Sequence, residues 1–308
     1  IGEFGLIDRI KQKPKDKNIL VGIGDDAAVV KIGNKLCTIT TDTLVEGDHF
    51  SLDYFTPEQI GMKAIEINVS DVGSMGGQPK YALVSLALKK EMDVEFVEKL
   101  YKGMRDAASK YGVEIIGGNL THADQIMIDI DLIGFVKKEN LCLRSHAKPG
   151  DFILVSGDLG GSTAGLNLFR DKVIGHESVK KKHLEPKAKL GKVKQFLRCI
   201  NAMMDISDGL ASEIAHICEQ SKVGAVIYAD NIPIKDEVRE AAEAVGKNPL
   251  DYALYGGEDF ELVFTVSEKN LKKVKGFLVG EITKEKGVKI YQNGKFSRLE
   301  KHGYDHFK

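Results

Sequence analysis

The sequence predicts an α+β fold divided into two domains, on three observations. Apolar runs of strand length alternate with longer stretches in which apolar residues recur every three or four positions. The chain has 308 residues, which is enough for two domains that each bury a core. Residues 137–151 turn basic and carry Pro149 and Gly150, which is typical of a domain junction. We therefore expect an N-terminal domain over residues 1–143 and a C-terminal domain over residues 144–308.

In the N-terminal half, apolar spacing predicts two helices. The helix over residues 56–69 opens with Thr56 as its cap and Pro57 in its first turn, and the helix over residues 94–111 repeats apolar residues at three and four. Strands are predicted over residues 19–22, 35–41, 81–87, 114–116 and 126–136.

The C-terminal half opens with a predicted strand over residues 152–156, a glycine-rich turn over 157–161 and a helix over 162–169. The lysine-rich stretch over 179–194 is interpreted as a solvated loop or helix face. Further on, we expect strands over 202–206, 224–229 and 261–266, a helix over 210–221, and a hairpin turn at Asn293 and Gly294.

Composition and charge limit the classes of function. Forty-four Lys and Arg nearly balance 45 Asp and Glu, so no field of the whole chain favours nucleic acid or an anionic membrane. No apolar run reaches the roughly 18 residues of a membrane span. The four cysteines lack the short spacings of a zinc or redox site and are expected to be buried thiols. A cytoplasmic protein is the resulting expectation.

Five short segments share one composition, with acidic residues next to glycine at the ends of predicted apolar strands. Side chains at a strand end can converge on a ligand, because a rigid scaffold passes the chain to a loop there. Any one segment could be only an Asx turn or a helix cap, and for Asp208 capping alone is an equal alternative. The segments are 24–26 (GDD), 40–42 (TTD), 68–71 (NVSD), 205–209 (DISDG) and 256–259 (GGED).

These segments favour a magnesium site. Asp25 and Asp26 are adjacent carboxylates that repel each other, and a cation would relieve that repulsion. Almost all the ligand atoms are oxygen, which favours Mg²⁺ or Ca²⁺ over zinc or copper. No twelve-residue calcium loop is present, and carboxylates from separate loops suit Mg²⁺ better.

Phosphate could be held by backbone N–H groups in three glycine-rich stretches, residues 73–77, 117–119 and 157–161. None matches the P-loop or dinucleotide fingerprint, and a single stretch of this kind is more often just a turn. Arg144 is a candidate for a bidentate phosphate contact, with an ordinary surface arginine as the alternative.

Seven longer motifs follow one another in the chain: GIGDDAAV (22–29), TTDTLVEGDHF (40–50), NVSDVGSMGGQP (68–79), IIGGN (115–119), RSHAKPGD (144–151), DISDGL (205–210) and GGEDFEL (256–262). With GEFGLI (2–7) and YDHF (304–307), they span nearly the whole chain. In this order they resemble the thiamine-monophosphate kinase family.

The resemblance implies the aminoimidazole ribonucleotide synthetase-like (PurM-like) architecture. In that architecture an N-terminal mixed α/β domain binds ATP and a C-terminal α/β domain follows it. It also implies a homodimer in which the N-terminal sheets pair across the two-fold axis, with active sites in the cleft between the domains.

Site residues follow from the resemblance by position. The metal positions implied are Asp26, Thr40, Thr41, Asp42, Asp71, Asn119, Asp205 and Asp208. Nucleotide contacts are implied for Thr41, Tyr101, Gly117, Gly118, Arg144 and Ser207, and positions near thiamine phosphate for His49, Glu258 and Tyr304. His49 could alternatively fill a turn, and Tyr304 could be a packing residue.

Asn119 departs from the family, which usually has Asp after the glycine pair. An amide oxygen can still ligate Mg²⁺ but brings no negative charge. The resemblance therefore implies that Asn119 is a weakened metal ligand.

The reaction implied by the resemblance is transfer of the γ-phosphoryl group of ATP to thiamine monophosphate, with several Mg²⁺ ions. Asp42, Asp71 and Asp208 would be the catalytic residues, because they position metal between two anions. Two alternatives remain open, a non-catalytic nucleotide and magnesium sensor and another ATP-dependent enzyme of the same superfamily.

Overall fold

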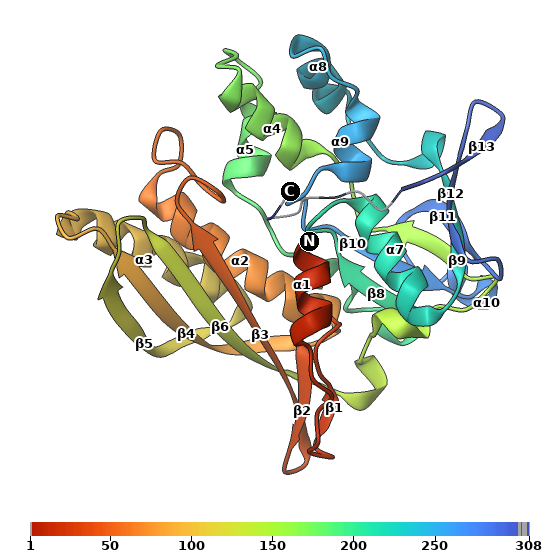
Figure 1. The fold of residues 1–308 in the computed structure, drawn as a ribbon, viewed down its shortest axis with the longest axis horizontal. Helices are drawn as coiled ribbons and strands as arrows, with labels where there is room; N and C mark the ends of the chain where they lie inside the picture. Colours follow the sequence, from red (N-terminus) through yellow and green to blue (C-terminus); the bar gives the residue numbers. More distant parts are fainter. Residues whose placement is uncertain (1, 301–302, 304–306, 308) are drawn as a thin grey trace.

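The computed structural model describes residues 2–300, 303 and 307, and within them the strands form two sheets (Figure 1). A six-stranded sheet comes from residues 19–136 and has the order β1-β2-β3-β6-β4-β5. A seven-stranded sheet follows in the order β13-β12-β9-β11-β7-β10-β8. The helices α2 and α3 lie over the first sheet, and α7 packs against the second.

In the first sheet, each strand pairs antiparallel with its neighbours, except β4 and β5, which run parallel. Alternate residues of β6, such as Ile128 and Ile130, are buried beneath α2 and α3, while the opposite face is partly exposed. The strands are β1 (Ile19–Val21), β2 (Ala28–Ile32), β3 (Lys35–Val45), β4 (Gln78–Leu88), β5 (Glu114–His122) and β6 (Met127–Val136).

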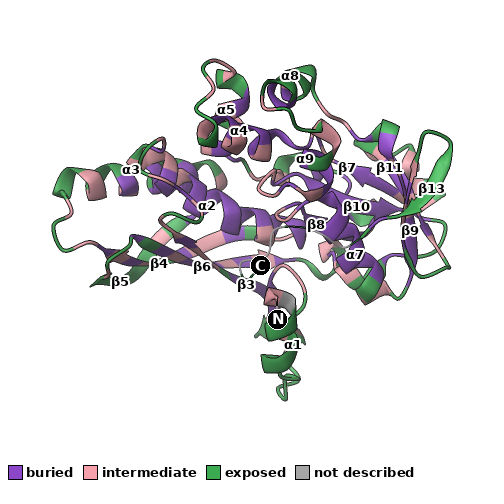
Figure 2. Cartoon of the chain, turned by 45° about the horizontal axis from the view of Figure 1, so that its top comes forward, coloured by how far each residue is buried: buried purple, intermediate pink, exposed green. Residues whose placement is uncertain are grey.

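The two helices on this sheet have strong local signals. In α2 (Pro57–Ser74), Thr56 and Gln59 form a capping box, and Pro57 occupies the first position. In α3 (Val94–Tyr111), the side chain of Asp93 caps the N-terminus, and Gly112 ends the helix in the left-handed conformation. The short helix α1 (Glu3–Ile10) is largely exposed (Figure 2).

The second sheet packs against the largest cluster of buried apolar residues among those that the structure describes. Its strands are β7 (Phe152–Val155), β8 (Ile200–Asp205), β9 (Gly224–Tyr228), β10 (Leu262–Val266), β11 (Phe277–Thr283), β12 (Gly287–Gln292) and β13 (Lys295–Arg298). The helices of this half are α4 (Gly161–Arg170), α5 (Glu177–Leu184), α6 (Leu190–Val193), α7 (Leu210–Ser221), α8 (Asp236–Ala244), α9 (Pro249–Tyr255) and α10 (Glu268–Leu271). Short 3₁₀ turns lie at η1 (Lys138–Asn140), η2 (Arg144–His146), η3 (Leu197–Cys199) and η4 (Ala229–Asn231).

Several predicted elements differ from the structure in extent or kind. Asp71 lies in the last turn of helix α2, and Asp42 lies inside the long strand β3, so neither is at a strand end. The glycines at 117 and 118 belong to strand β5 and do not form a turn. The lysine-rich stretch forms α5 and α6, and it buries Val179, His183 and Val193.

The two sheets approach each other through α2, whose C-terminal half contacts β8 of the second sheet. The hydroxyl of Ser70 on α2 donates to Oδ2 of Asp205 at the end of β8, at 2.6 Å. In the part of the chain that the structure describes, no helix is long and apolar enough to cross a membrane. All four cysteines are free thiols.

Candidate active site

An acidic cluster forms where the β1–β2 loop, β3, the end of α2 and the end of β8 meet. In the β1–β2 loop, Asp26 is almost fully buried and its carboxylate accepts hydrogen bonds from Arg144 and from Ser74. The backbone N–H of Arg144 donates to Asp25 at 2.9 Å. Arg144 therefore joins the start of the second half of the chain to the β1–β2 loop.

Asp42 and Asp71 face each other between β3 and α2. The hydroxyl of Thr40 donates to Oδ2 of Asp71 at 2.5 Å and to the carbonyl oxygen of Asp26 at 3.3 Å. A hydrogen bond links the carboxyl groups of Asp42 and Asp71. Strand β3 thus contributes two adjacent polar side chains, and α2 contributes the third.

The second half of the chain adds Asp205 and Asp208. Asp205 is buried at the end of β8, and the backbone N–H of Asp208 donates to Oε1 of the buried Glu213 at 2.8 Å. The N-cap position of helix α7 is Gly209, and Asp208 directly precedes it. Glu213 fixes the loop that carries Asp208.

Burial and mutual repulsion raise the pKa values of several of these carboxyls. Burial raises the pKa of Asp42 to about 7, and the nearby Asp129, Asp208 and Asp26 add to the rise. The pKa values of Asp71 and Asp205 are raised well above the usual range, first by burial and then by neighbouring carboxylates. The cluster is therefore a group of acids that lacks enough positive charge.

The donor set fits a divalent cation, although the carboxylates are not closely grouped. Among residues 2–300, 303 and 307, no three acidic, histidine or cysteine side chains lie close enough together to hold a metal ion. Their oxygens are instead engaged by Thr40, Ser70, Ser74 and Arg144. A cation would offset the repulsion that contributes to the raised pKa values of Asp42, Asp71 and Asp205.

A second polar group surrounds Glu258. Oε1 of Glu258 lies 2.5 Å from Nζ of the fully buried Lys63, which also donates to the carbonyl oxygen of His49 at 2.7 Å. Oε2 lies 3.4 Å from Nδ1 of His183. Burial alone would raise the pKa of Glu258, but Lys63 and His183 lower it to about 2. The structure thus brings His49 and Glu258 together, although 209 residues separate them in sequence.

Other predicted site residues lie away from the acidic cluster within one chain. Asp42 pairs with Ile130, which pairs with Val84, which in turn pairs with Gly118. Three strand spacings separate Gly118 from Asp42, which is about 14 Å. Gly117 and Asn119 lie on the same exposed edge strand β5.

Tyr101 and Thr41, two further predicted nucleotide contacts, also lie away from the acidic cluster, and one predicted substrate contact falls outside the described residues. Tyr101 lies on α3, and the hydroxyl of Thr41 donates to Asp129 at 2.9 Å on the face of the sheet opposite α2. Ser207 lies in the loop between Asp205 and Asp208. Tyr304 lies outside the described residues.

Sequence reasoning missed the buried polar residues that organise both groups. Lys63 and Glu213 lie inside helices, where an isolated charged residue reads as solvent-facing. His183 is hidden in a lysine-rich segment. Lys63 and His183 contact residues of the other half of the chain, and Glu213 contacts the loop of Asp208, so no local pattern identified them.

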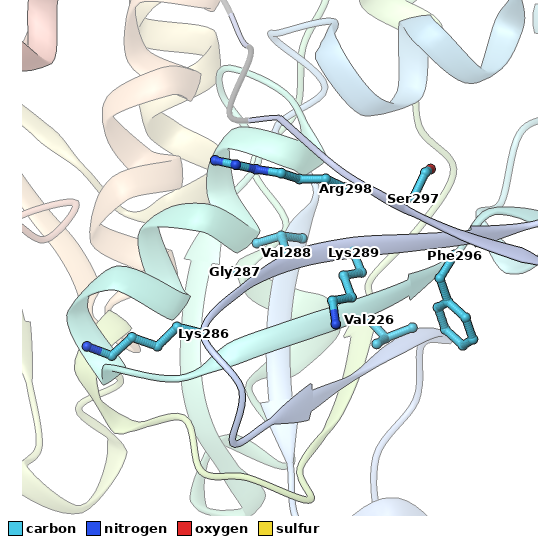
Figure 3. A pocket seen from close by; sticks show the side chains of 8 residues that line it. All are labelled: Val226, Lys286, Gly287, Val288, Lys289, Phe296, Ser297 and Arg298. Atoms are coloured by element: carbon cyan, nitrogen blue, oxygen red, sulfur yellow. The ribbon is translucent and has the colours of Figure 1, made fainter.

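A separate pocket lies on the second sheet, between β9, β12 and β13 (Figure 3). It is lined by Val226, Val288, Phe296 and the basic side chains of Lys286, Lys289 and Arg298. It contains none of the predicted site residues, so the acidic cluster and not this pocket is the candidate active site.

Two family models match the chain. Residues 24–136 match the AIR synthase related protein, N-terminal domain, and residues 148–293 match the AIR synthase related protein, C-terminal domain. Both ranges lie within the halves that carry the two sheets.

Full-length relatives are similar as well. The thiamine-monophosphate kinase of Aquifex aeolicus is 39% identical over 312 residues, covering 100% of this chain and 98% of its own length. The thiamine-monophosphate kinase of Bacillus subtilis is 37% identical, covering 99% of each chain. The solved structure of AaThiL complexed with AMPPCP and TMP is 39% identical with a TM-score of 0.90, covering 99% of this chain and 97% of that one. The expected two-domain fold is thereby confirmed.

Proposed function

We propose that this chain, which belongs to the thiamine-monophosphate kinase family of AIR synthase related proteins, transfers the γ-phosphoryl group of ATP to thiamine monophosphate. The observation that carries the proposal is that Asp26, Asp42, Asp71 and Asp205, from four separate segments, lie near enough for neighbouring carboxyls to raise the pKa values of Asp42, Asp71 and Asp205. Similarity over the full length to kinases of this name supports the choice of substrates.

In this reaction an oxygen of the acceptor phosphate forms a bond to the γ-phosphorus of ATP. The bond between that phosphorus and the β–γ bridging oxygen breaks, so that ADP leaves and thiamine diphosphate remains. A phosphate monoester has a second pKa near 6 and is largely ionised at neutral pH. The protein therefore needs no strong general base, and its task is to align two anions.

The metal is Mg²⁺ in our proposal, held by Asp26, Thr40, Asp42, Asp71, Asp205 and Asp208. When bound, it would offset the repulsion between the phosphate groups, which is roughly 332/(ε·r) kcal/mol for each pair of unit charges. We assign Asp42, Asp71 and Asp208 the role of positioning metal, and none of them the role of nucleophile. The raised pKa values of Asp42 and Asp71, and the oxygen-only chemistry of all three side chains, support this assignment.

Arg144 and Ser207 are the proposed nucleotide contacts near this cluster. The guanidinium of Arg144 is planar and suits phosphate oxygens in pairs. His49 and Glu258 are the proposed contacts of thiamine monophosphate. We also propose that the boundary between the two domains lies between Leu143 and Arg144. The free thiols are consistent with a cytoplasmic protein.

A homodimer is the proposed assembly, with the exposed face of the first sheet as its interface. That face presents large apolar side chains, including Ile39, Leu83 and Met127, while β5 adds the exposed Ile116. Pairing of two such faces would also place the β5 strand of the partner, which carries Gly117, Gly118 and Asn119, at the interface. Sedimentation of the wild type and of Leu83→Arg tests this, and a wild-type monomer would contradict it.

The catalytic proposal is tested by incubating the protein with ATP, Mg²⁺ and thiamine monophosphate. We expect thiamine diphosphate and ADP in equal amounts, and neither product when EDTA replaces Mg²⁺. Nucleotide binding without any thiamine diphosphate would overturn the proposal and support a sensor.

A further inference from the structure

Lys63 is the one lysine among the described residues that has no exposed side-chain surface and joins both halves of the chain. Its Nζ lies 2.7 Å from the carbonyl oxygen of His49, in the β3–α2 connection. It lies 2.5 Å from Oε1 of Glu258, in the loop before β10. A single ammonium group therefore fixes the distance between two segments from different domains.

Stability alone does not explain a lysine at this position. Burying an ammonium group is costly, and replacing a buried ion pair by apolar residues of similar volume is often neutral or stabilising. The neighbourhood is also apolar, since Nζ lies 5.4 Å from the ring centroid of Phe55. A methionine would fill the same space, so the charge calls for another explanation.

The backbone conformation of Glu258 indicates that the explanation is functional. Its φ is +64°, in the left-handed region that non-glycine residues seldom adopt, and such strain is concentrated at functional sites. The side chain is still 28% exposed. With Oε1 held by Lys63, Oε2 is the oxygen that faces His183.

The surroundings of Oε2 suit a ring that contains nitrogen. His183 is 3% exposed, and its Nε2 has no hydrogen-bond partner among the described residues. Tyr54 and Phe169 stack across the two halves with ring centroids 4.3 Å apart, and both lie within about 6.5 Å of the His183 ring. The carboxylate of Glu258, an imidazole nitrogen without a hydrogen-bond partner and a stacked pair of aromatic rings therefore lie close together.

We infer that Lys63 is a positioning residue for the acceptor substrate, which holds Glu258 so that Oε2 faces the nitrogen-bearing rings of thiamine monophosphate. The inference rests on the proposed function. Lys63 lies away from the acidic cluster and pairs with none of its carboxylates, so it serves acceptor binding and not nucleotide binding.

If Lys63 has this role, its substitution should change KM for thiamine monophosphate much more than KM for ATP. Without the ammonium group, Glu258 is free to rotate and the His49 loop loses its anchor. We expect Lys63→Met to raise KM for thiamine monophosphate at least 10-fold, with KM for ATP changed less than 2-fold. Lys63→Gln keeps a hydrogen-bond donor, so its KM for thiamine monophosphate should lie between those of the wild type and Lys63→Met.

Glu185→Ala is the matched control. It removes a different contact between the halves, the 3.3 Å hydrogen bond from Gln59, which lies one turn before Lys63 on α2. Both KM values of this variant should stay within 2-fold of wild type. A rise in KM for thiamine monophosphate equal to that of Lys63→Met would overturn the inference.

Calorimetric titration of thiamine monophosphate without ATP supplies a second readout, and it can use Lys63→Gln if Lys63→Met does not fold. Weaker binding of the acceptor with unchanged binding of AMPPCP supports the inference. Unchanged acceptor binding, or equal weakening of both ligands, overturns it. Since wild-type turnover is measured first, a wild type that forms no thiamine diphosphate would reject the proposed function separately.

Discussion

The backbone N–H of Glu258 donates a 2.7 Å hydrogen bond to the carbonyl oxygen of Ser207. The next bond of this pairing runs from Phe260 to Ile206 at 2.9 Å. The loop that presents the acceptor-side carboxylate is thus fastened to the loop that carries Asp205 and Asp208. Acceptor and metal sites are held in register by backbone contacts.

Gly257→Ala should disrupt that register. A Cβ at residue 257 would lie 2.4 Å from the carbonyl oxygen of Ser207, so one of the two loops must move. We expect kcat/KM to fall on the order of 100-fold, because catalysis by alignment is lost with small displacements. Gly191→Ala is the control, since its Cβ meets nothing within 4 Å. Wild-type kinetics for Gly257→Ala would show that the pairing is dispensable.

Asp71→Asn and Asp208→Asn should each lower kcat on the order of 100-fold or more, because each removes a negative charge from the proposed metal site. The melting temperature of Asp71→Asn should not fall, since the lost carboxyl is buried beside Asp42 and Asp205. Asp106→Asn, on the exposed surface of α3, is the control. Near-normal turnover would reject the metal assignment.

Asn119→Asp should retain activity and lower the Mg²⁺ concentration needed for half-maximal rate. The substitution restores the charge that the family usually has at this position, and carboxylates bind Mg²⁺ more tightly than amides. Because Asn119 lies on edge strand β5, this effect should require the dimer. An unchanged Mg²⁺ requirement in a dimeric protein argues against a metal role.

Asp259 should make stability decline between about pH 4 and pH 7. Burial raises its pKa to about 7, although N–H groups of Gly160 and Ser162 oppose the rise. Because this pKa exceeds the ordinary value of 3.8, the folded state binds more protons than the unfolded state in that window. The stability present at low pH is therefore lost as pH rises.

Urea unfolding at pH 5 and pH 8 measures this loss. We expect the decline to be smaller in Asp259→Asn than in the wild type by roughly 3 kcal/mol, because about two pH units separate pH 5 from the pKa and each contributes about 1.4 kcal/mol. Equal declines in the two proteins would mean that Asp259 does not titrate in this range.

Gly103→Ala should destabilise the first domain without touching the site. Helices α2 and α3 approach so closely that a Cβ at residue 103 would lie 1.9 Å from the carbonyl oxygen of Glu58. Since backbone cannot yield as a side chain can, we expect a loss of about 3 kcal/mol of unfolding free energy. Chemical denaturation measures it, and a loss below about 0.5 kcal/mol would contradict the close packing.

Local patterns predicted those elements whose ends are set by local chemistry. The helix Val94–Tyr111 was predicted with both ends correct, because an amphipathic stripe is framed by Asp93 and Gly112. The hairpin at Asn293 and Gly294 was predicted for the same reason, and it joins β12 to β13. In each case the residues that decide the structure are neighbours in sequence.

Features decided by distant contacts were predicted only in part. The start and most of the length of α2 were predicted, but the helix is buried on almost every side, which hides its period, so its last turn was missed and residues 68–71 read as a strand end. Strand β3 continues through Asp42 because Thr41 and Thr43 bond to Asp129 on the neighbouring strand. The distance from Asp42 to Asn119 depends on strand order, which residue spacing does not encode.

The ion pair between Arg144 and Asp26 has a consequence for how the site fills. The side chain of Arg144 is 15% exposed and that of Asp26 is 1% exposed. Because an unpaired buried charge is costly, Arg144 cannot leave Asp26 unless another positive charge takes its place. Binding of a cation beside Asp26 would then release Arg144. The released guanidinium could pair with the phosphate groups of an incoming nucleotide. Cation and nucleotide should consequently bind with positive cooperativity, each lowering the energetic barrier that the other meets.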